Sequence, residues 1–127
     1  MNLEKVVFGF FIVLAATLNF GFLIGDIDRP ELHNVYELFA AIVVNLIATV
    51  LKFGDRTQIG AVHLSTSLVA DLQLLAAAIT WAVAVHVTGT GMTPLVTSSV
   101  VSLSGGALFA NVVSVVILIS ETVMMRR

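Results

Sequence analysis

Four long apolar stretches, separated by short polar segments, dominate the sequence. They cover about residues 3–24, 31–53, 58–87 and 94–124. Each stretch holds the ~20 residues that an α-helix needs to cross the hydrocarbon core of a bilayer. The pattern therefore predicts an all-α fold, in which residues 1–127 form a single domain, an integral membrane bundle of four transmembrane helices.

Turn and capping residues mark where these helices begin and end. The segment 25–30 separates the first two helices, with its proline fitting a first helical turn. Asp55 or Thr57 can cap the third helix, and Thr93 and Pro94 form an N-cap and first-turn pair for the fourth. In the first helix we expect five phenylalanines to form a bulky lipid-facing surface: Phe8, Phe10, Phe11, Phe20 and Phe22.

Basic residues are distributed unevenly between the two predicted ends of the bundle. One end carries Lys5, Lys52, Arg56, Arg126 and Arg127. The other end carries Arg29 alone, next to Asp26 and Asp28. Because short cytoplasmic segments are enriched in Lys and Arg, both termini are predicted to be cytoplasmic.

Inside the third stretch, polar and ionisable side chains recur at helical spacing. At 100° per residue, His63, Ser67 and Asp71 lie on one stripe, Gln73 widens it, and Ser65 lies behind it. An ionisable group near the bilayer centre costs between ~2.5 and ~17 kcal/mol, depending on how the cost is measured, and normally faces a partner helix or a wet cavity. We therefore expect the other helices to cover or hydrate this stripe.

Each predicted helix carries an amide or carboxyl group near mid-membrane depth. At ~1.5 Å of rise per residue, Asp71 and Asn111 lie ~18 Å from the cytoplasmic ends of their helices. Gln73 and Asn19 lie at ~21 Å and Asn45 at ~12 Å on the same count. Such a layer could pass a proton or coordinate a dehydrated cation. The three asparagines could instead hold the helices together by interhelical hydrogen bonds of ~0.6 kcal/mol each.

Small residues recur at strict four-residue spacing along the fourth stretch. The seam consists of Ser98, Ser102, Gly106, Ala110 and Ser114. Small residues at this spacing let helix backbones approach closely. The seam therefore predicts a tight helix contact, either within the bundle or between subunits of an oligomer.

Composition supports a membrane protein and removes several classes of function. The chain is 58% hydrophobic and 11% charged, with a mean hydropathy of +1.06. It contains no cysteine, no phosphate-binding glycine loop and no metalloprotease or hydrolase motif, so we expect neither an enzyme nor a cofactor or metal site. Six basic residues scattered over loops and ends also argue against nucleic-acid binding.

Two segments resemble a family of small bacterial inner-membrane proteins that has no established activity. They are NVYELFAAIVVNLIATVLKFGDRTQIGAVHL at residues 34–64 and LVADLQL at residues 68–74. The resemblance covers most of the chain and implies a multi-pass protein of the bacterial inner membrane. It also implies an association with potassium transport.

Two functions are consistent with these features. The first is a homo-oligomeric cation channel or proton-coupled conductor, which carries a monovalent cation or a proton past the central charge of Asp71. His63 and Ser67 would then form the cytoplasmic approach to that charge, and Asn45, Gln73 and Asn111 would supply ligands or hydrogen bonds. The second is a non-conducting accessory subunit that docks on a larger transporter through the fourth helix. Whether Asp71 faces a wet axis or is sealed inside one bundle distinguishes the two.

Overall fold

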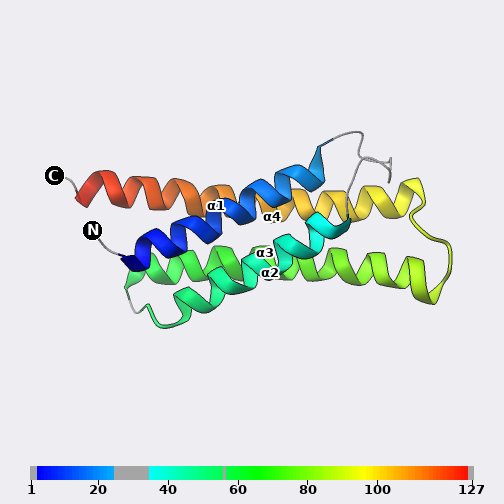
Figure 1. The fold of residues 1–127 in the computed structure, drawn as a ribbon, viewed down its shortest axis with the longest axis horizontal. Helices are drawn as coiled ribbons and strands as arrows, with labels where there is room; N and C mark the ends of the chain where they lie inside the picture. Colours follow the sequence, from blue (N-terminus) through cyan, green and yellow to red (C-terminus); the bar gives the residue numbers. More distant parts are fainter. Residues whose placement is uncertain (1–2, 25–34, 56, 126–127) are drawn as a thin grey trace.

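A computed structural model of the chain describes residues 3–24, 35–55 and 57–125, which are helical apart from short connections. The elements are α1 (Leu3–Leu23), α2 (Val35–Phe53), α3 (Gln58–Ala82), the π-helix η2 (Val83–Val87) and α4 (Pro94–Met125) (Figure 1). They form four helices that are long and apolar enough to cross a membrane, with η2 extending α3. The predicted turn at 25–30, the start of the second helix at 31, Arg56, Arg126 and Arg127 lie outside the described residues.

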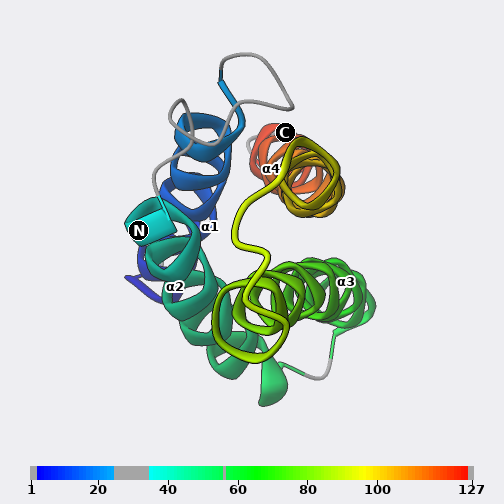
Figure 2. The ribbon, with the colours of Figure 1, turned by 90° about the vertical axis from the view of Figure 1, so that its right-hand side faces the viewer.

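The four helices form a ring in which each packs against two neighbours. The packed pairs are α1 with α2, α2 with α3, α3 with α4, and α4 with α1 (Figure 2). Successive helices run in opposite directions, so the N-terminus of α1 and the C-terminus of α4 lie at one end of the bundle (Figure 1). The connection between α2 and α3 lies at this same end, which we call the terminal end.

Side-chain caps begin α3 and α4 where the sequence predicts them. The Thr57 hydroxyl is the N-cap of α3 and accepts a hydrogen bond of 3.0 Å from the Gly60 N–H. At α4, the Thr93 hydroxyl accepts a bond of 3.2 Å from the Val96 N–H. The predicted cap of α4 is confirmed, and of the two candidates for α3, Asp55 and Thr57, the cap is Thr57. Each hydroxyl satisfies an N–H that the first helical turn leaves without a backbone partner.

The connection between α3 and α4 begins with a widened helical turn that the sequence pattern does not indicate. The Thr88 N–H donates to the Val83 carbonyl at 2.8 Å, a bond to the fifth preceding residue, as in a π-helix. Gly89 and Gly91 follow with φ angles of +72° and +73°. Glycine tolerates these left-handed angles without a Cβ clash, so the chain can turn sharply back into α4.

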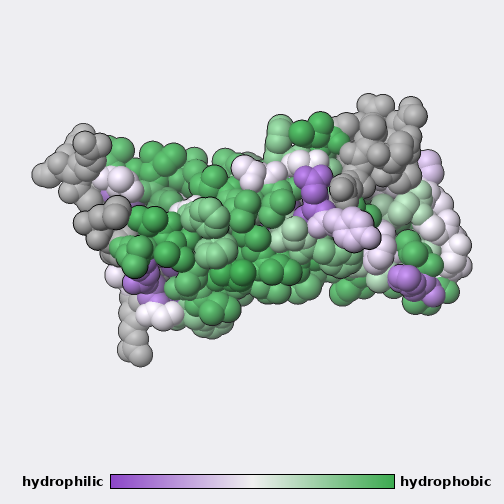
Figure 3. All heavy atoms as spheres, in the orientation of Figure 1, coloured by the Kyte–Doolittle hydropathy of each residue, from purple (hydrophilic) through white to green (hydrophobic). Residues whose placement is uncertain are grey.

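Large apolar side chains lie both in the core and on the outer surface. Of the five phenylalanines expected to face lipid, Phe10 and Phe20 are 61% and 55% exposed. The prediction is wrong for Phe8 and Phe22, which are fully buried and belong to the two apolar clusters of the core. The face shown in Figure 3 is apolar across its middle, with hydrophilic residues gathered toward the two ends.

Candidate functional site

All four helices turn polar side chains into the bundle. We call this set the polar interior, and its members are Asn19, Asn45, Thr49, Lys52, His63, Ser67, Asp71, Thr97, Ser104, Asn111 and Ser114. None of them is more than 7% exposed. The predicted stripe of α3 faces inward as expected, whereas Ser65 on the opposite face of the helix is exposed. An interior this polar is unusual, because buried polar groups normally require a hydrogen-bonding partner.

Asp71 lies against α2, with a threonine as its partner. Its Oδ2 atom is 2.5 Å from the hydroxyl of Thr49. The same hydroxyl lies 2.9 Å from the backbone oxygen of Asn45, one turn earlier in α2. The side chain of Asn45 bonds to its own helix, donating to the Ala41 carbonyl at 2.9 Å. The carboxyl group therefore belongs to a contact between α3 and α2 inside a single bundle.

His63 occupies the polar interior closer to the terminal end. Its Nδ1 atom lies 2.6 Å from the hydroxyl of Ser114 on α4. The edge of its ring meets Phe8 of α1, with ring centroids 5.0 Å apart. The charged groups whose fields reach His63 are Lys52, Glu121, Asp55 and Lys5. His63 thus lies between the central carboxyl of Asp71 and a charged end.

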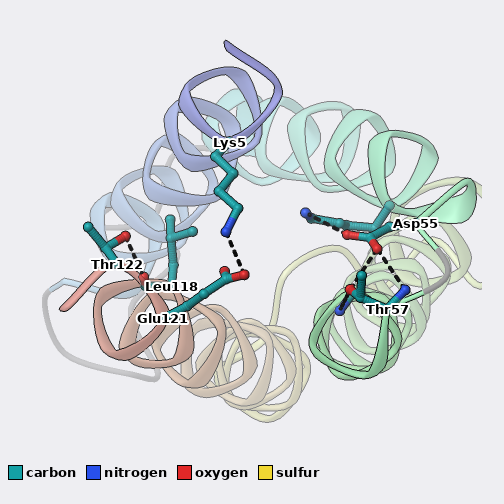
Figure 4. A network of polar contacts seen from close by, with 8 residues as sticks. Lys5, Asp55, Thr57, Leu118, Glu121 and Thr122 are labelled. Atoms are coloured by element: carbon teal, nitrogen blue, oxygen red, sulfur yellow. Dashed lines mark hydrogen bonds and ion pairs between the residues drawn. The ribbon is translucent and has the colours of Figure 1, made fainter. Parts of the chain in front are cut away.

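Among the described residues, two ion pairs lie at the terminal end. Lys5 of α1 meets Glu121 of α4 at 2.5 Å, and Figure 4 shows the two side chains pointing toward each other across the gap between the helices. In the second pair, Lys52 Nζ lies 3.4 Å from Asp55 Oδ2. The same nitrogen lies 4.4 Å from the centroid of the Phe8 ring. Lys52 is only 4% exposed, so its side chain is buried within the bundle.

Asp55 is stabilised as a carboxylate in the connection between α2 and α3. The Thr57 hydroxyl donates to Asp55 Oδ1 at 2.7 Å, and the Thr57 backbone N–H donates to the same oxygen at 2.9 Å (Figure 4). These two bonds, followed by the charge of Lys52, lower the pKa of Asp55 below its ordinary value. Asp55 therefore balances the charge of Lys52 at neutral pH.

Two glycines make room for longer polar side chains between helices. A Cβ atom added at Gly106 of α4 would collide with the side-chain amide of Gln73 from α3. In the same way, a Cβ at Gly21 of α1 would collide with the carboxylate of Glu37 from α2. Gln73 and Glu37 are partly buried, so polar groups extend beyond the fully buried set.

Many atoms of the polar interior have no hydrogen-bond partner among the described residues. These atoms are Asn19 Nδ2, Asn45 Oδ1, His63 Nε2, Ser67 Oγ, Asp71 Oδ1, Thr97 Oγ1, and Nδ2 and Oδ1 of Asn111. A buried polar atom left unpaired costs about 1–3 kcal/mol. The eight atoms include both donors and acceptors, so small molecules that both donate and accept hydrogen bonds, such as water, would suit this interior.

The structure places five of the predicted residues in two different situations. His63, Asp71 and Asn19 make contacts between helices, with Asn19 Oδ1 accepting a bond of 3.2 Å from the Ser104 hydroxyl. Ser67 and Asn111 are buried without a partner among the described residues. The sequence predicted interhelical hydrogen bonds for three asparagines. In the part of the chain that the structure describes, the bond from Ser104 to Asn19 is the one that is found.

The seam of small residues on α4 divides into two parts. Gly106 lies against Gln73, Ala110 is buried, and Ser114 bonds to His63, so this part packs within the bundle. Ser102 is exposed and Ser98 is partly exposed, so that part faces outward. One even spacing thus serves two surfaces, because each step of four residues turns about 40° beyond a full helical turn, so the seam winds around α4.

The sequence singled out neither Ser104 nor Thr97, and it predicted an inward-packing polar face for Thr49 without assigning this residue to the site. Thr49 lies on the polar face of the second apolar stretch and is four residues from Asn45, a spacing that puts both on one helix face. That spacing was the available signal for Thr49. Ser104 and Thr97 lie off the four-residue seam, and only the packing of α4 reveals that they are buried.

The acidic and imidazole side chains are too dispersed for a metal site of the usual kind. Across residues 3–24, 35–55 and 57–125, no three of the His, Asp and Glu side chains converge as metal ligands. The polar interior instead consists mainly of hydroxyl and amide groups around a single carboxyl group. Such groups can relay protons through water or replace part of the water shell of a monovalent cation.

Comparison with known proteins gives a family but no activity. The sequence profile of a family of unknown function (DUF6394) matches residues 32–122. No curated protein and no solved structure matches the chain.

Proposed function

Because the chain belongs to this family of unknown function, we propose a function from its own side chains: the bundle spans a membrane and conducts a monovalent cation or a proton through its polar interior. The four apolar helices support the first half of this proposal, because each is long enough to cross and carries large apolar side chains on its outer face. The polar interior supports the second half.

The observation that carries the proposal is the set of eight buried polar atoms without a partner among the described residues. A bundle that only had to hold its helices together would gain stability from apolar residues at these positions. Water molecules would satisfy all of these atoms, and a partly dehydrated cation would satisfy the oxygens among them, as they do in conducting membrane proteins. Intramembrane carboxyl groups such as Asp71 mark ion pathways and proton relays for the same reason.

The proposed pathway runs through each bundle rather than along an axis between copies. From the terminal end it passes His63, Ser67 and Asp71 on α3. Asn45, Gln73, Asn111 and Asn19 then supply hydrogen bonds from the helices around it. Copies of the chain would associate through outer surfaces, including the exposed part of the α4 seam, and would not need to share one pore.

We place the protein in the bacterial inner membrane, with both termini in the cytoplasm. Lys5 and Lys52 support this orientation, because both lie at the terminal end and basic residues favour the cytoplasmic side. In this orientation His63 faces the cytoplasmic end of the pathway. The resemblance of residues 34–64 and 68–74 to proteins associated with potassium transport makes potassium one cation to test.

Ion flux through liposomes that contain only the purified full-length chain tests this proposal. We expect flux of a cation or of protons above that of empty liposomes, and a large loss in Asp71→Asn. Ser67→Ala should also reduce flux, whereas Ser65→Ala on the exposed face of the same helix should not. Equal effects of the two serine variants, or no flux above empty liposomes, would contradict the proposal.

A non-conducting accessory subunit is the second candidate, and the outward-facing part of the α4 seam supports it. Ser102 is exposed and Ser98 partly exposed, at a spacing that admits another helix closely. This function predicts that substitution of Ser102 by a bulky residue disrupts assembly with a larger transporter. It also predicts no flux by the isolated chain, so the liposome experiment separates the two candidates.

A further inference from the structure

We propose that the conducted ion is a proton, and that Asp71 and Thr49 together form the group that carries it. This inference rests on the proposed function and specifies its substrate. Thr49 acts as a positioning residue for the carboxyl group. The proposal is carried by one hydrogen-bond geometry and by the chemical identity of the atoms that line the interior.

The geometry concerns a hydroxyl group between two acceptors. Thr49 Oγ1 lies 2.9 Å from the Asn45 backbone oxygen and 2.5 Å from Asp71 Oδ2. A hydroxyl has one proton to donate and can accept through its lone pairs. The backbone oxygen can only accept, so both contacts become full hydrogen bonds when the carboxyl group is protonated and donates to Thr49. The arrangement therefore fits a neutral Asp71.

The same hydroxyl also fits an ionised Asp71. When the carboxyl group loses its proton, rotation about the C–O bond of Thr49 lets the hydroxyl donate to Asp71 Oδ2 instead of to Asn45. The charge then gains a hydrogen bond, and the carbonyl of Asn45 keeps its helical environment. Thr49 can thus form a hydrogen bond with Asp71 in both protonation states without movement of the backbone. A carboxyl group that repeatedly gains and loses a proton requires such a partner.

The unpartnered atoms suit water better than a metal cation. Five of the unpartnered atoms are oxygens that can accept hydrogen bonds, on Asn45, Ser67, Asp71, Thr97 and Asn111, but the amide nitrogens of Asn19 and Asn111 can only donate. A dehydrated metal cation requires oxygen ligands and is repelled by amide N–H groups. Water accepts from one group and donates to the next, so a mixed lining orders a chain of water molecules along which protons can move.

Charged groups lie away from Asp71: Glu37, in the first turn of α2, lies toward the end opposite the terminal end, and the other charged groups that the structure describes lie toward the terminal end. Lys52 of α2 and Asp55 of the following connection form one pair, and Lys5 of α1 with Glu121 of α4 forms the other. On α3 itself, the nearest titratable residue toward this end is His63, two helical turns away. No ion pair to Asp71 is found among residues 3–24, 35–55 and 57–125. Asp71 can therefore exchange its proton without breaking a salt bridge.

The transfer itself involves the protein and water alone. In the release step the carboxyl group of Asp71 first turns its O–H from Thr49 to a water molecule; the O–H bond then breaks, its electron pair remains on the carboxylate oxygen, and the proton forms a bond to that water molecule. The Thr49 hydroxyl then donates to the carboxylate. In the loading step a hydronium ion from the opposite side gives its proton to the carboxylate, and the Thr49 hydroxyl turns back to Asn45.

Liposomes that contain the full-length chain can test this inference separately from the proposed function. The probes are a pH-sensitive dye inside the vesicles and electrodes for potassium and sodium outside them. We expect proton flux without potassium or sodium flux. Potassium or sodium flux without proton flux would overturn the inference while leaving ion conduction intact. Absence of all flux would overturn the proposed function as well.

Substitutions of Thr49 test its role in the carrier. Thr49→Val keeps the shape but removes the hydroxyl, and should lower proton flux about tenfold, since a hydrogen bond to a charged group is lost. Thr49→Ser keeps the hydroxyl and should restore flux well above that of Thr49→Val. Equal flux in the valine and serine variants would overturn the role of the hydroxyl.

Infrared spectroscopy gives a readout that does not depend on flux. At neutral pH the difference spectrum between the native chain and Asp71→Asn should contain the carbonyl stretch of a protonated carboxyl group. In Thr49→Val that band should move, because the carboxyl group loses its acceptor. Carboxylate bands in place of the carbonyl stretch would overturn the assignment of a neutral Asp71.

Discussion

The imidazole Nδ1 of His63 and the hydroxyl of Ser114 lie 2.6 Å apart, although 51 residues separate them in the chain. Both side chains are fully buried, so this contact joins α3 to α4 inside the bundle. The contact also fixes the orientation of the imidazole ring. The other ring nitrogen, Nε2, has no hydrogen-bond partner among the described residues. A structural contact and the entrance to the proposed pathway thus depend on the same pair.

Removal of the Ser114 hydroxyl should destabilise the protein. Ser114→Ala leaves the buried Nδ1 of His63 without its partner, which we expect to cost about 1 kcal/mol. Thermal unfolding of the purified chain in detergent measures the loss. Ser120→Ala, on an exposed position of the same helix, serves as the control and should unfold like the native chain. Equal stability of the two variants would show that the bond does not form.

Two asparagines should respond in opposite ways to replacement by leucine. Asn19→Leu breaks the bond to Ser104 and should lower stability by about 1 kcal/mol. Asn111→Leu removes two buried polar atoms that have no described partner, so it should leave stability unchanged or raise it. Thermal unfolding compares the variants, and liposome flux should fall in Asn111→Leu despite its stability. A large destabilisation by Asn111→Leu would instead indicate a purely structural amide.

Two adjacent glycines of α4 provide a matched pair. Gly105→Ala meets only Leu23 at 3.7 Å, an ordinary contact, and should stabilise the helix by about 0.5–1 kcal/mol. Gly106→Ala displaces the Gln73 amide from its place between α3 and α4, so it should be about 1 kcal/mol less stable than Gly105→Ala. Removal of the amide in a Gln73→Ala background should abolish the difference in unfolding temperature. A difference that persists in that background would contradict the contact.

The Asp55 carboxylate predicts a dependence of stability on acidic pH. Because the folded-state pKa of Asp55 lies below its ordinary value of 3.8, its contribution is present above that value and is lost as pH falls through the lowered pKa. Thr57→Ala removes the two contacts of its hydroxyl, with Asp55 and with the Gly60 N–H, and the loss of the cap alone should cost about 1 kcal/mol.

The comparison of Thr57→Ala with Thr57→Ser isolates the hydroxyl, because serine retains both contacts. Unfolding followed by circular dichroism at neutral pH and at about pH 3 should show a stability gap that is smaller in acid, because below the ordinary pKa of 3.8 the unfolded chain binds a proton at Asp55 and the stabilising contribution declines toward the lowered pKa of the folded state. The part of the gap that comes from the cap should remain. A gap of the same size at both pH values would contradict the lowered pKa of Asp55.

The sequence was sufficient for the helices and for the polar stripe of α3. Apolar runs of spanning length predicted four helices, and the hydroxyls of Thr57 and Thr93 marked the starts of α3 and α4. The spacing of His63, Ser67 and Asp71 predicted one shared face, and all three are buried. These features depend on local periodicity and capping, which the chain encodes without reference to other helices.

Partners across helices could not be predicted in this way. Nothing in the pattern links Thr49 to Asp71 or Ser114 to His63, because such pairs depend on how the helices are rotated against each other. Phe8 and Phe22 were assigned to the lipid surface for a related reason. In α1 apolar side chains lie on nearly every face, so hydrophobicity alone cannot distinguish the core from the membrane.

The central claim is that water reaches the polar interior of each bundle, and magnetisation transfer from water to the protein in solid-state NMR tests it most directly. The full-length chain would be labelled with nitrogen-15 and embedded in lipid bilayers. We predict that the side-chain amide of Asn111 and the free ring nitrogen of His63 receive magnetisation from water as early as the exposed residues Thr88, Gly89 and Thr90 do. Signals from these two groups that rise no sooner than those of the buried core residues Ile12 and Ala15 would contradict the claim.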